Sequence, residues 1–160
     1  MKIRQRIAHL KEIYIDVGQK INPGDKLGKM GNTGESDGAH FHVDSWIVED
    51  WMPWDYMPRV LDFESGKIIA APEHTEFLVG FGMDEGFLGC KPRITMYYHD
   101  SRYTRLRKKR HWGTDLIPSV TAKNVCRWNR SKDANCIYAG PDKPDLSRGY
   151  GNVIILEMDI

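Results

Sequence analysis

Short runs of apolar residues, most of them bounded by glycine or proline, dominate the pattern along the chain. Some runs alternate apolar with polar positions and others are rich in β-branched residues, and both patterns are typical of strands. The glycines and prolines between the runs predict frequent chain reversals. The runs that predict strands are residues 12–17, 67–70, 77–81 and 152–158.

Helical signals are weak along the whole sequence. No window shows a long amphipathic period with capping residues at its ends. One short helix is predicted within Met52–Leu61, where Pro53 and Pro58 shorten it. Together these features predict a mainly β fold.

The composition is that of an ordinary globular domain of 160 residues, 41% of them hydrophobic. A net charge of +1 excludes a globally basic nucleic-acid binder and a highly charged disordered tail. No apolar run of about 18 residues predicts a membrane-spanning helix, and residues 1–6 lack the apolar stretch of a signal peptide. We expect a protein made in the cytoplasm, which lysis, injection or particle assembly would have to carry outside.

The cysteines Cys90, Cys126 and Cys136 are an odd and sparse set. Such a set argues against a disulfide framework, and the absence of a C-x-x-C pair argues against a thiolate zinc site. We expect free thiols that are mostly buried, because a free cysteine behaves as a small hydrophobe.

A basic cluster occupies residues 102–110, where Lys or Arg fills most positions. Its simplest interpretation is a solvated loop or strand edge. The functional alternative is attraction to an anionic polymer, such as cell-wall teichoic acid or nucleic acid. Because the chain as a whole is almost neutral, we do not interpret the cluster as a nucleic-acid site.

Among the six histidines, His40 and His42 form the densest pair. Residues two apart on a strand point to the same face, so the two imidazoles would project together. The glycine-rich residues 31–38 just before them form a loop able to pass close to a ligand. An H-x-H pair also occurs as two ordinary histidines on a half-exposed strand, so the pair alone does not define a site.

His111 and Asp115 form a second group of candidate ligands. Gly113 and Pro118 favour a strand or loop here over a helix, on which this spacing would share one face. The segment is not an H-E-x-x-H motif, because Trp112 stands in the position of the glutamate. Two imidazoles and one carboxylate suit Zn²⁺, and three protein ligands with an open fourth position are typical of a catalytic site. His111, Asp115 and one histidine of the H-x-H pair would complete this set and leave the other histidine for acid–base chemistry.

Six short segments share the motifs of one known domain. Four lie in the first 46 residues, namely Ala8-His9-Leu10, Val17–Gly28, Gly31–Gly34 and His40-Phe41-His42. They resemble the C-terminal half of the lysostaphin-type (LytM-type) zinc endopeptidases, which cut peptide cross-links in bacterial peptidoglycan. The later segments His111–Leu116 and Gly149–Val153 resemble the N-terminal half of the same domain. The resemblance implies a mainly β fold with antiparallel sheets forming an open groove, the duplicated hybrid motif architecture.

The order of these motifs differs from that of the family, in which H-x-x-x-D precedes A-H-L and H-x-H. Reading residues 93–160 and then 1–46 restores the usual order, so the chain resembles a circular permutant. It would be a single peptidase domain over 1–160, with 47–92 as a joining segment that packs on the domain. The new termini would lie at a hairpin tip, where they are best tolerated. Alternatively, two half-domains could pair between chains in a swapped dimer.

Residue by residue, the resemblance implies one Zn²⁺ ion held by His42, His111 and Asp115. His9 and His40 would be the catalytic histidines, near the metal but not bound to it, and either could be the general base. The ion would polarise the scissile carbonyl and activate a water molecule.

Further residues have less defined roles. Some members of the family add a tyrosine that hydrogen-bonds the developing oxyanion. Tyr97, Tyr98 and Tyr103 lie upstream of the H-x-x-x-D motif, and none of them aligns clearly. His74 and His99 match no motif and are expected to be structural or exposed.

The function implied by the resemblance is cleavage of peptidoglycan peptides at the bacterial cell wall. The enzyme would be a phage endolysin or a tail-associated lysin that works with other tail proteins. No nucleic-acid or membrane partner is expected, while the oligomeric state and the bond that is cut stay open. The opposing hypothesis is an inactive peptidoglycan-binding or structural module of the same fold, such as a virion scaffold. A biotinyl or lipoyl carrier pattern also fits residues 17–28, but it lacks the flanks of a carrier lysine and leaves the histidines unexplained.

Overall fold

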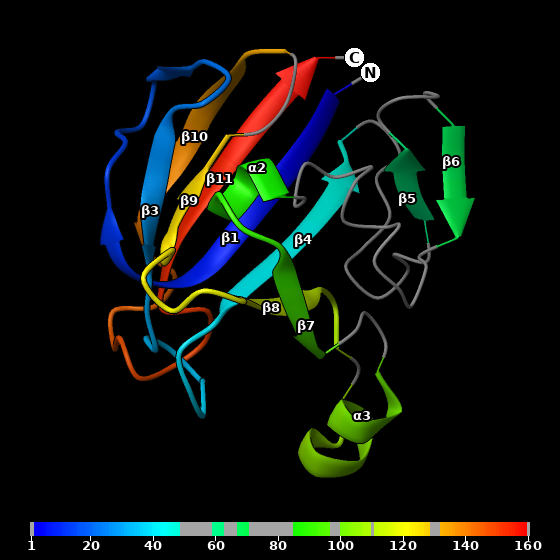
Figure 1. Ribbon diagram of the computed structural model, residues 1–160. Coiled ribbons are helices and arrows are strands. Elements are labelled where there is room, and N and C mark those ends of the chain that lie inside the picture. The colour runs from blue at the N-terminus through cyan, green and yellow to red at the C-terminus, as the bar shows by residue number, and fades with distance from the viewer. Residues whose placement is uncertain are drawn as a thin grey trace.

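The computed structural model describes residues 2–48, 59–62, 67–70, 85–96, 100–109, 111–128 and 132–159. In this part of the chain, nine strands form one sheet with the order β2-β10-β11-β1-β4-β8-β7, in which β3 pairs with both β1 and β9 (Figure 1). Every pairing in it is antiparallel. The predicted mainly β, antiparallel fold is therefore confirmed. The strands of this sheet are β1 (Lys2–Ile13), β2 (Lys20–Ile21), β3 (Lys26–Met30), β4 (Phe41–Ile47), β7 (Pro92–Met96), β8 (Thr114–Pro118), β9 (Val125–Arg127), β10 (Ala134–Pro141) and β11 (Asn152–Asp159).

The strand predictions are confirmed in part. β11 (Asn152–Asp159) and β6 (Lys67–Ala70), which pairs with β5 (Arg59–Asp62), match two of the predicted runs. The prediction for 12–17 is wrong beyond Ile13, where β1 ends. The chain turns there because Gly18, with a φ of 87°, reverses it toward β10 and donates its N–H to the Cys136 carbonyl. The run 77–81 lies outside the described residues.

Among the described residues, two short helices, α2 (Glu85–Leu88) and α3 (Ser101–Arg107), accompany the sheet. The helix predicted within Met52–Leu61 is wrong for residues 59–61, which belong to β5, and its other residues lie outside the described ones. The basic cluster is neither a loop nor a strand edge over most of its length, because it forms α3. The Asp100 side chain caps the start of this helix by accepting from the Arg102 N–H, and Lys108 ends it in a left-handed conformation.

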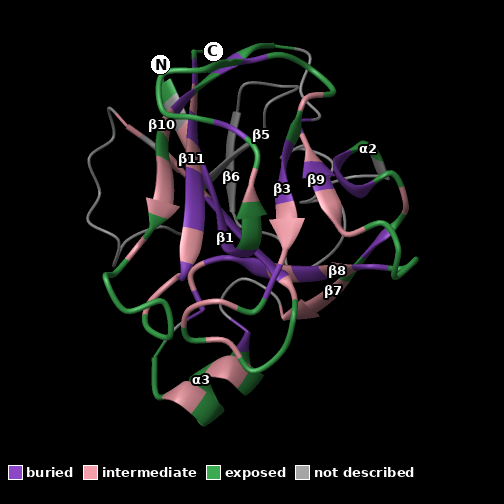
Figure 2. Ribbon diagram, turned by 90° about the vertical axis from the view of Figure 1, so that its left-hand side faces the viewer, coloured by how far each residue is buried: buried purple, intermediate pink, exposed green. Residues whose placement is uncertain are grey.

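One apolar core lies beneath the long central strands. Figure 2 shows its buried residues concentrated on β1, β11 and β8, with α2 also buried. Phe87 of α2 packs edge-on against Phe41 of β4, with ring centroids 5.7 Å apart, so this end of the predicted joining segment packs on the sheet. The expected free thiols are also confirmed, since Cys126 and Cys136 are buried and Cys90 is half-buried. The largest side chains that are fully buried are Ile7, Leu10, Ile21, Leu27, Phe41, Phe87, Leu116, Ile154 and Leu156.

The central strand pairs join segments that are far apart in the sequence. β1 pairs with β11 from Lys2 opposite Asp159 onward, so the two ends of the chain lie side by side (Figure 1). β4, which begins inside the H-x-H motif and carries His42, pairs with β8, which carries the end of the H-x-x-x-D motif. None of the helices in the described ranges is long and apolar enough to cross a membrane.

Candidate active site

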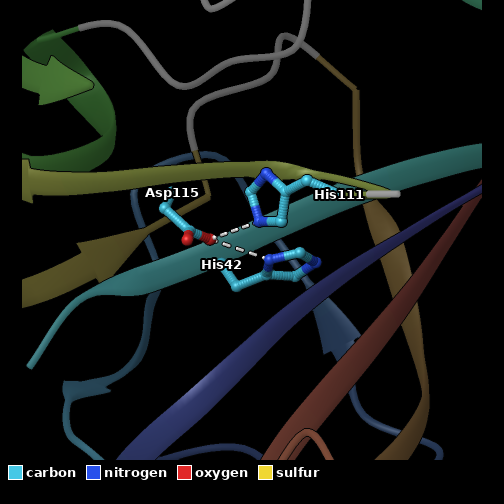
Figure 3. Close-up of side chains that lie close together, drawn as sticks. All are labelled: His42, His111 and Asp115. Atoms are coloured by element: carbon cyan, nitrogen blue, oxygen red, sulfur yellow. Dashed lines mark hydrogen bonds and ion pairs between the residues drawn. The ribbon is translucent and has the colours of Figure 1, made fainter. Parts of the chain in front are cut away.

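Strand pairing between β4 and β8 brings the predicted metal ligands together. His42 stands directly opposite Asp115 in the register, and its Nδ1 lies 2.8 Å from Asp115 Oδ1. His111 lies just before β8, with its Nε2 3.1 Å from the same oxygen. Figure 3 shows the carboxylate of Asp115 between the two imidazoles. The Nε2 of His40 approaches this oxygen as well, at 3.5 Å.

The charge balance at Asp115 fits a cation site. Burial alone would raise the pKa of Asp115, but hydrogen bonds from His111, His40 and His42 outweigh it and hold that pKa far below its ordinary value. The ligand atoms of His42, His111 and Asp115 all lie within 4.8 Å of one another. Two imidazole nitrogens and a carboxylate oxygen that converge in this way match the donor set of a catalytic zinc site.

Gly113 explains how β8 lies so close to His42. A Cβ at this position would stand 2.5 Å from His42 Nε2 and 2.8 Å from the Val43 carbonyl oxygen, both shorter than van der Waals contact. The Nε2 of His42 is buried and has no hydrogen-bond partner among the described residues, so the ring makes its polar contact through Nδ1. The absence of a side chain at Gly113 therefore lets the two strands bring His42 and Asp115 together.

A bulge in β1 directs His9 toward this cluster. The register of β1 against β11 shifts between Ile7 and Leu10, and His9 has a φ of 61°, a strained conformation for a residue other than glycine. Its ring lies 4.8 Å from that of His40 and 5.9 Å from that of His42, measured between centroids. Burial, together with the neighbouring histidines His42 and His40, lowers the pKa of His9 to about 4. His9 is therefore uncharged at neutral pH.

Backbone carbonyls fix the tautomers of His9 and His40. The Nδ1 of His9 lies 2.6 Å from the Thr33 carbonyl oxygen, and the Nδ1 of His40 lies 2.7 Å from that of Gly38. A carbonyl oxygen can only accept, so each Nδ1 carries a proton. The uncharged His9 therefore keeps a free lone pair on Nε2. Burial alone would lower the pKa of His40, but the facing Asp115 carboxylate outweighs burial and raises that pKa above its ordinary value. Thr33 is held in turn by its hydroxyl, which donates to the Leu10 carbonyl at 2.9 Å. The G-N-T-G motif thus positions one of the two histidines.

The histidines open into a pocket of about 540 Å³. One wall is the loop 35–38 and another is α3, which are joined by ion pairs. Arg107 pairs with both Glu35 and Asp37, and Lys109 pairs with Glu35 at 3.4 Å. Acidic partners therefore offset part of the basic cluster, and its helix forms a side of the pocket.

Sequence reasoning missed Tyr150, whose ring lies against an imidazole of the site, and Arg6, which lies on the Tyr150 ring. The Tyr150 ring is 5.4 Å from that of His42, and the Arg6 guanidinium lies 3.8 Å from the Tyr150 ring centroid. Tyr150 belongs to the segment Gly149–Val153 that resembles the family. Its two flanking glycines predict a turn, but they do not predict that the tyrosine ring packs against the candidate site. Among the candidate tyrosines, Tyr103 stacks on His111 with centroids 4.5 Å apart. Tyr97, Tyr98, His74 and His99 lie outside the described residues.

Comparison with known proteins finds one family whose model matches part of this chain. Residues 2–52 match the model of Peptidase family M23, and this segment holds His9, His40 and His42. A relative from Buchnera aphidicola subsp. Baizongia pistaciae (strain Bp), called an "Uncharacterized metalloprotease", is 46% identical over 42 residues. The aligned residues cover 26% of this chain and 11% of that relative. No solved structure matches the chain significantly. The resemblance to the M23 (LytM-type) peptidases is therefore confirmed for the N-terminal segment, while His111 and Asp115 lie beyond it.

Proposed function

We propose that the protein is a zinc-dependent endopeptidase that cleaves peptide cross-links or stem peptides of bacterial peptidoglycan. The observation that carries the proposal is the convergence of three imidazole nitrogens on one oxygen of the half-buried Asp115, which lines the pocket. The match of residues 2–52 to a peptidase family and the name of the metalloprotease relative support it.

Five residues would divide the chemistry between them. His42, His111 and Asp115 would hold the ion, which when bound supplies Lewis acidity toward a peptide carbonyl and toward water. His9 keeps Nε2 unprotonated, whereas His40 Nε2 faces the Asp115 carboxylate, which favours its protonated form. One of these two nitrogens would accept the proton of the attacking water. The other, once protonated, would stabilise the oxyanion or protonate the leaving amine.

The test is mass spectrometry of the soluble peptides released from purified peptidoglycan. One wall should contain glycine cross-bridges and the other direct cross-links, and each digestion should be run with chelator and with zinc restored. We expect chelator-sensitive release whose new amino termini identify the bond that is cut. Asp115→Asn should abolish release, whereas Asp145→Asn, a control on an exposed loop, should retain it. A folded, zinc-loaded protein that releases nothing from either wall would refute the proposal and favour an inactive binding module.

For the biological setting, we propose a phage endolysin or a tail-associated lysin, as the sequence analysis predicts. The two differ in where the protein is found. An antibody against the chain should detect a lysin in purified virions, and an endolysin only in lysates of infected cells. Detection in neither fraction would contradict both roles.

We also propose that the chain is a circularly permuted domain. The pairing of β1 with β11 and of β4 with β8 supports this, because both pairs join the two halves that the family has in the opposite order. A gene encoding residues 85–160 followed by 1–46, which keeps α2 and its Phe87 in the core, should give a folded monomer that binds one zinc ion. A wild-type chain that elutes only as a dimer would instead favour the swapped arrangement.

A further inference from the structure

A buried ion pair lies on the same side of the sheet as the candidate metal ligands. Arg6 of β1 stands directly opposite Asp44 of β4, and both side chains are less than a tenth exposed. The Arg6 Nε donates to Asp44 Oδ1 at 2.9 Å and its Nη2 donates to the other carboxylate oxygen. Asp44 and His42 are two apart on β4 and so project from the same face. The pair is therefore anchored beside the site and not at a distant edge of the sheet.

Arg6 is in turn stacked on an aromatic ring that touches the site. Its guanidinium carbon lies 3.8 Å from the centroid of Tyr150, a distance typical of a cation–π contact. The Tyr150 ring lies 5.4 Å from that of His42 and 6.2 Å from that of His9. The Tyr150 carbonyl also accepts the His9 backbone N–H at 2.9 Å. One residue therefore contacts both a candidate ligand and a candidate catalytic histidine.

The backbone around Tyr150 is fixed, which leaves its ring to be fixed by Arg6. Gly149 and Gly151 have φ values of 61° and 63°, and a side chain on either would meet neighbouring loops. The Tyr150 N–H donates to Asp142 Oδ2 at 3.1 Å. A planar guanidinium held at two nitrogens can hold a ring in one orientation, whereas a lysine ammonium cannot.

Stability alone does not explain why a charge pair is buried here. Burying two charges is costly, and well-packed apolar residues in place of such a pair often leave a protein equally stable or more stable. We propose that Arg6 is a positioning residue, which through its pair with Asp44 holds the Tyr150 ring against His42 and His9. This inference rests on the proposed function for its effect on catalysis, but the ring contact itself can be measured without activity.

The first test compares Arg6→Lys with Arg4→Lys, a matched control on the same strand. Arg4 pairs with Glu157 and its side chain is 36% exposed, so the control makes the same Arg-to-Lys change in an ion pair that is not stacked on Tyr150. In the metal-free protein, NMR should show the ring protons of His42 and His9 shifted in Arg6→Lys and unchanged in Arg4→Lys, because the ring current of Tyr150 has moved. Unchanged histidine shifts in a folded Arg6→Lys protein would overturn the proposal.

The second test uses the active enzyme and its cobalt derivative. Arg6→Lys should lower kcat by about tenfold or more with little change in KM, since a small displacement of catalytic groups has large effects on rate. It should also change the visible spectrum of the Co²⁺-loaded protein, which reports ligand geometry. Tyr150→Phe keeps the ring and should resemble wild type, whereas Tyr150→Leu should resemble Arg6→Lys. If Arg6→Lys does not fold, Tyr150→Leu tests the same contact.

The outcomes separate this inference from the proposed function. If the wild-type protein releases no peptides from either peptidoglycan, the proposed function fails. The NMR chemical shifts of the histidine rings and the spectrum of the Co²⁺-loaded protein still decide the role of Arg6. If wild type is active and Tyr150→Leu keeps both the wild-type kcat and the wild-type spectrum, Arg6 has no positioning role. A loss in Tyr150→Phe equal to that in Tyr150→Leu would also overturn the proposal, because the hydroxyl and not the held ring would then be responsible.

Discussion

Replacing Gly113 by alanine perturbs the site through one added carbon atom. The new Cβ would lie 2.5 Å from His42 Nε2 and 2.6 Å from its Cε1, whereas ordinary contacts begin at 3.4 Å. The ring, or β8 itself, must therefore move by about 0.9 Å, the difference between 3.4 and 2.5 Å. Overpacking of this kind costs about 1–3 kcal/mol of folding free energy. A displacement near 1 Å of a group in the active site costs on the order of 100-fold in rate.

The assay pairs urea unfolding with kcat/KM for release of wall peptides. Gly28→Ala is the matched control, because its Cβ would lie 2.7 Å from the Glu12 carbonyl oxygen and 3.2 Å from Leu10 Cδ1, outside the pocket. Both variants should lose a similar amount of folding free energy. Only Gly113→Ala should lose most of its activity. If the two variants lose the same fraction of activity, the reasoning about His42 and Gly113 is wrong.

Three further changes test other parts of the fold. Hydrogen bonds from Arg4 and Lys2 outweigh burial and lower the pKa of Glu157, so its contribution to stability is present above the ordinary glutamate pKa and is lost as pH falls through the lowered value. Glu157→Gln should therefore cost up to about 1 kcal/mol by urea unfolding at pH 7 and almost nothing near pH 3; an equal cost at both pH values would contradict this. Glu35→Gln removes a partner of Arg107 and should speed protease cleavage near α3 while changing stability by less than about 0.5 kcal/mol. Unchanged cleavage would show that this ion pair does not hold α3 against the loop 35–38. Leu27→Ala empties a fully buried site and should cost about 2–5 kcal/mol in thermal or urea unfolding, a loss that an exposed site would not show.

The sequence allowed the ligand set to be predicted because its members lie in short motifs. His111 and Asp115 are four residues apart, and His42 belongs to an H-x-H pair. Each of these short spacings predicts part of the ligand set of a metal site. Spacing alone did not choose between His40 and His42, and the resemblance was needed for that choice. The structure brings together the three residues that the resemblance named.

Other features depend on contacts that the sequence pattern does not contain. His9 reaches the site through a bulge and a positive φ, and regular alternation in a strand gives no sign of either. From the sequence alone, Arg6 is a charged residue with no identifiable partner. Only the pairing of β1 with β4 places it beside Asp44. The helix α3 has no buried residue and hence no apolar period, so its local signals were its capping residue Asp100 and the basic residues Arg105 and Arg107 in its last turn.

Zinc titration of the metal-free protein, followed by calorimetry, tests the central claim most directly. The account predicts one ion per chain for wild type, loss of tight binding in Asp115→Asn, and retention of binding in His40→Ala. The last variant is decisive because His40 Nε2 lies only 3.5 Å from the same Asp115 oxygen and yet is assigned to proton transfer. A folded wild-type chain that binds no zinc would contradict the account, as would a His40→Ala protein that loses as much affinity as Asp115→Asn.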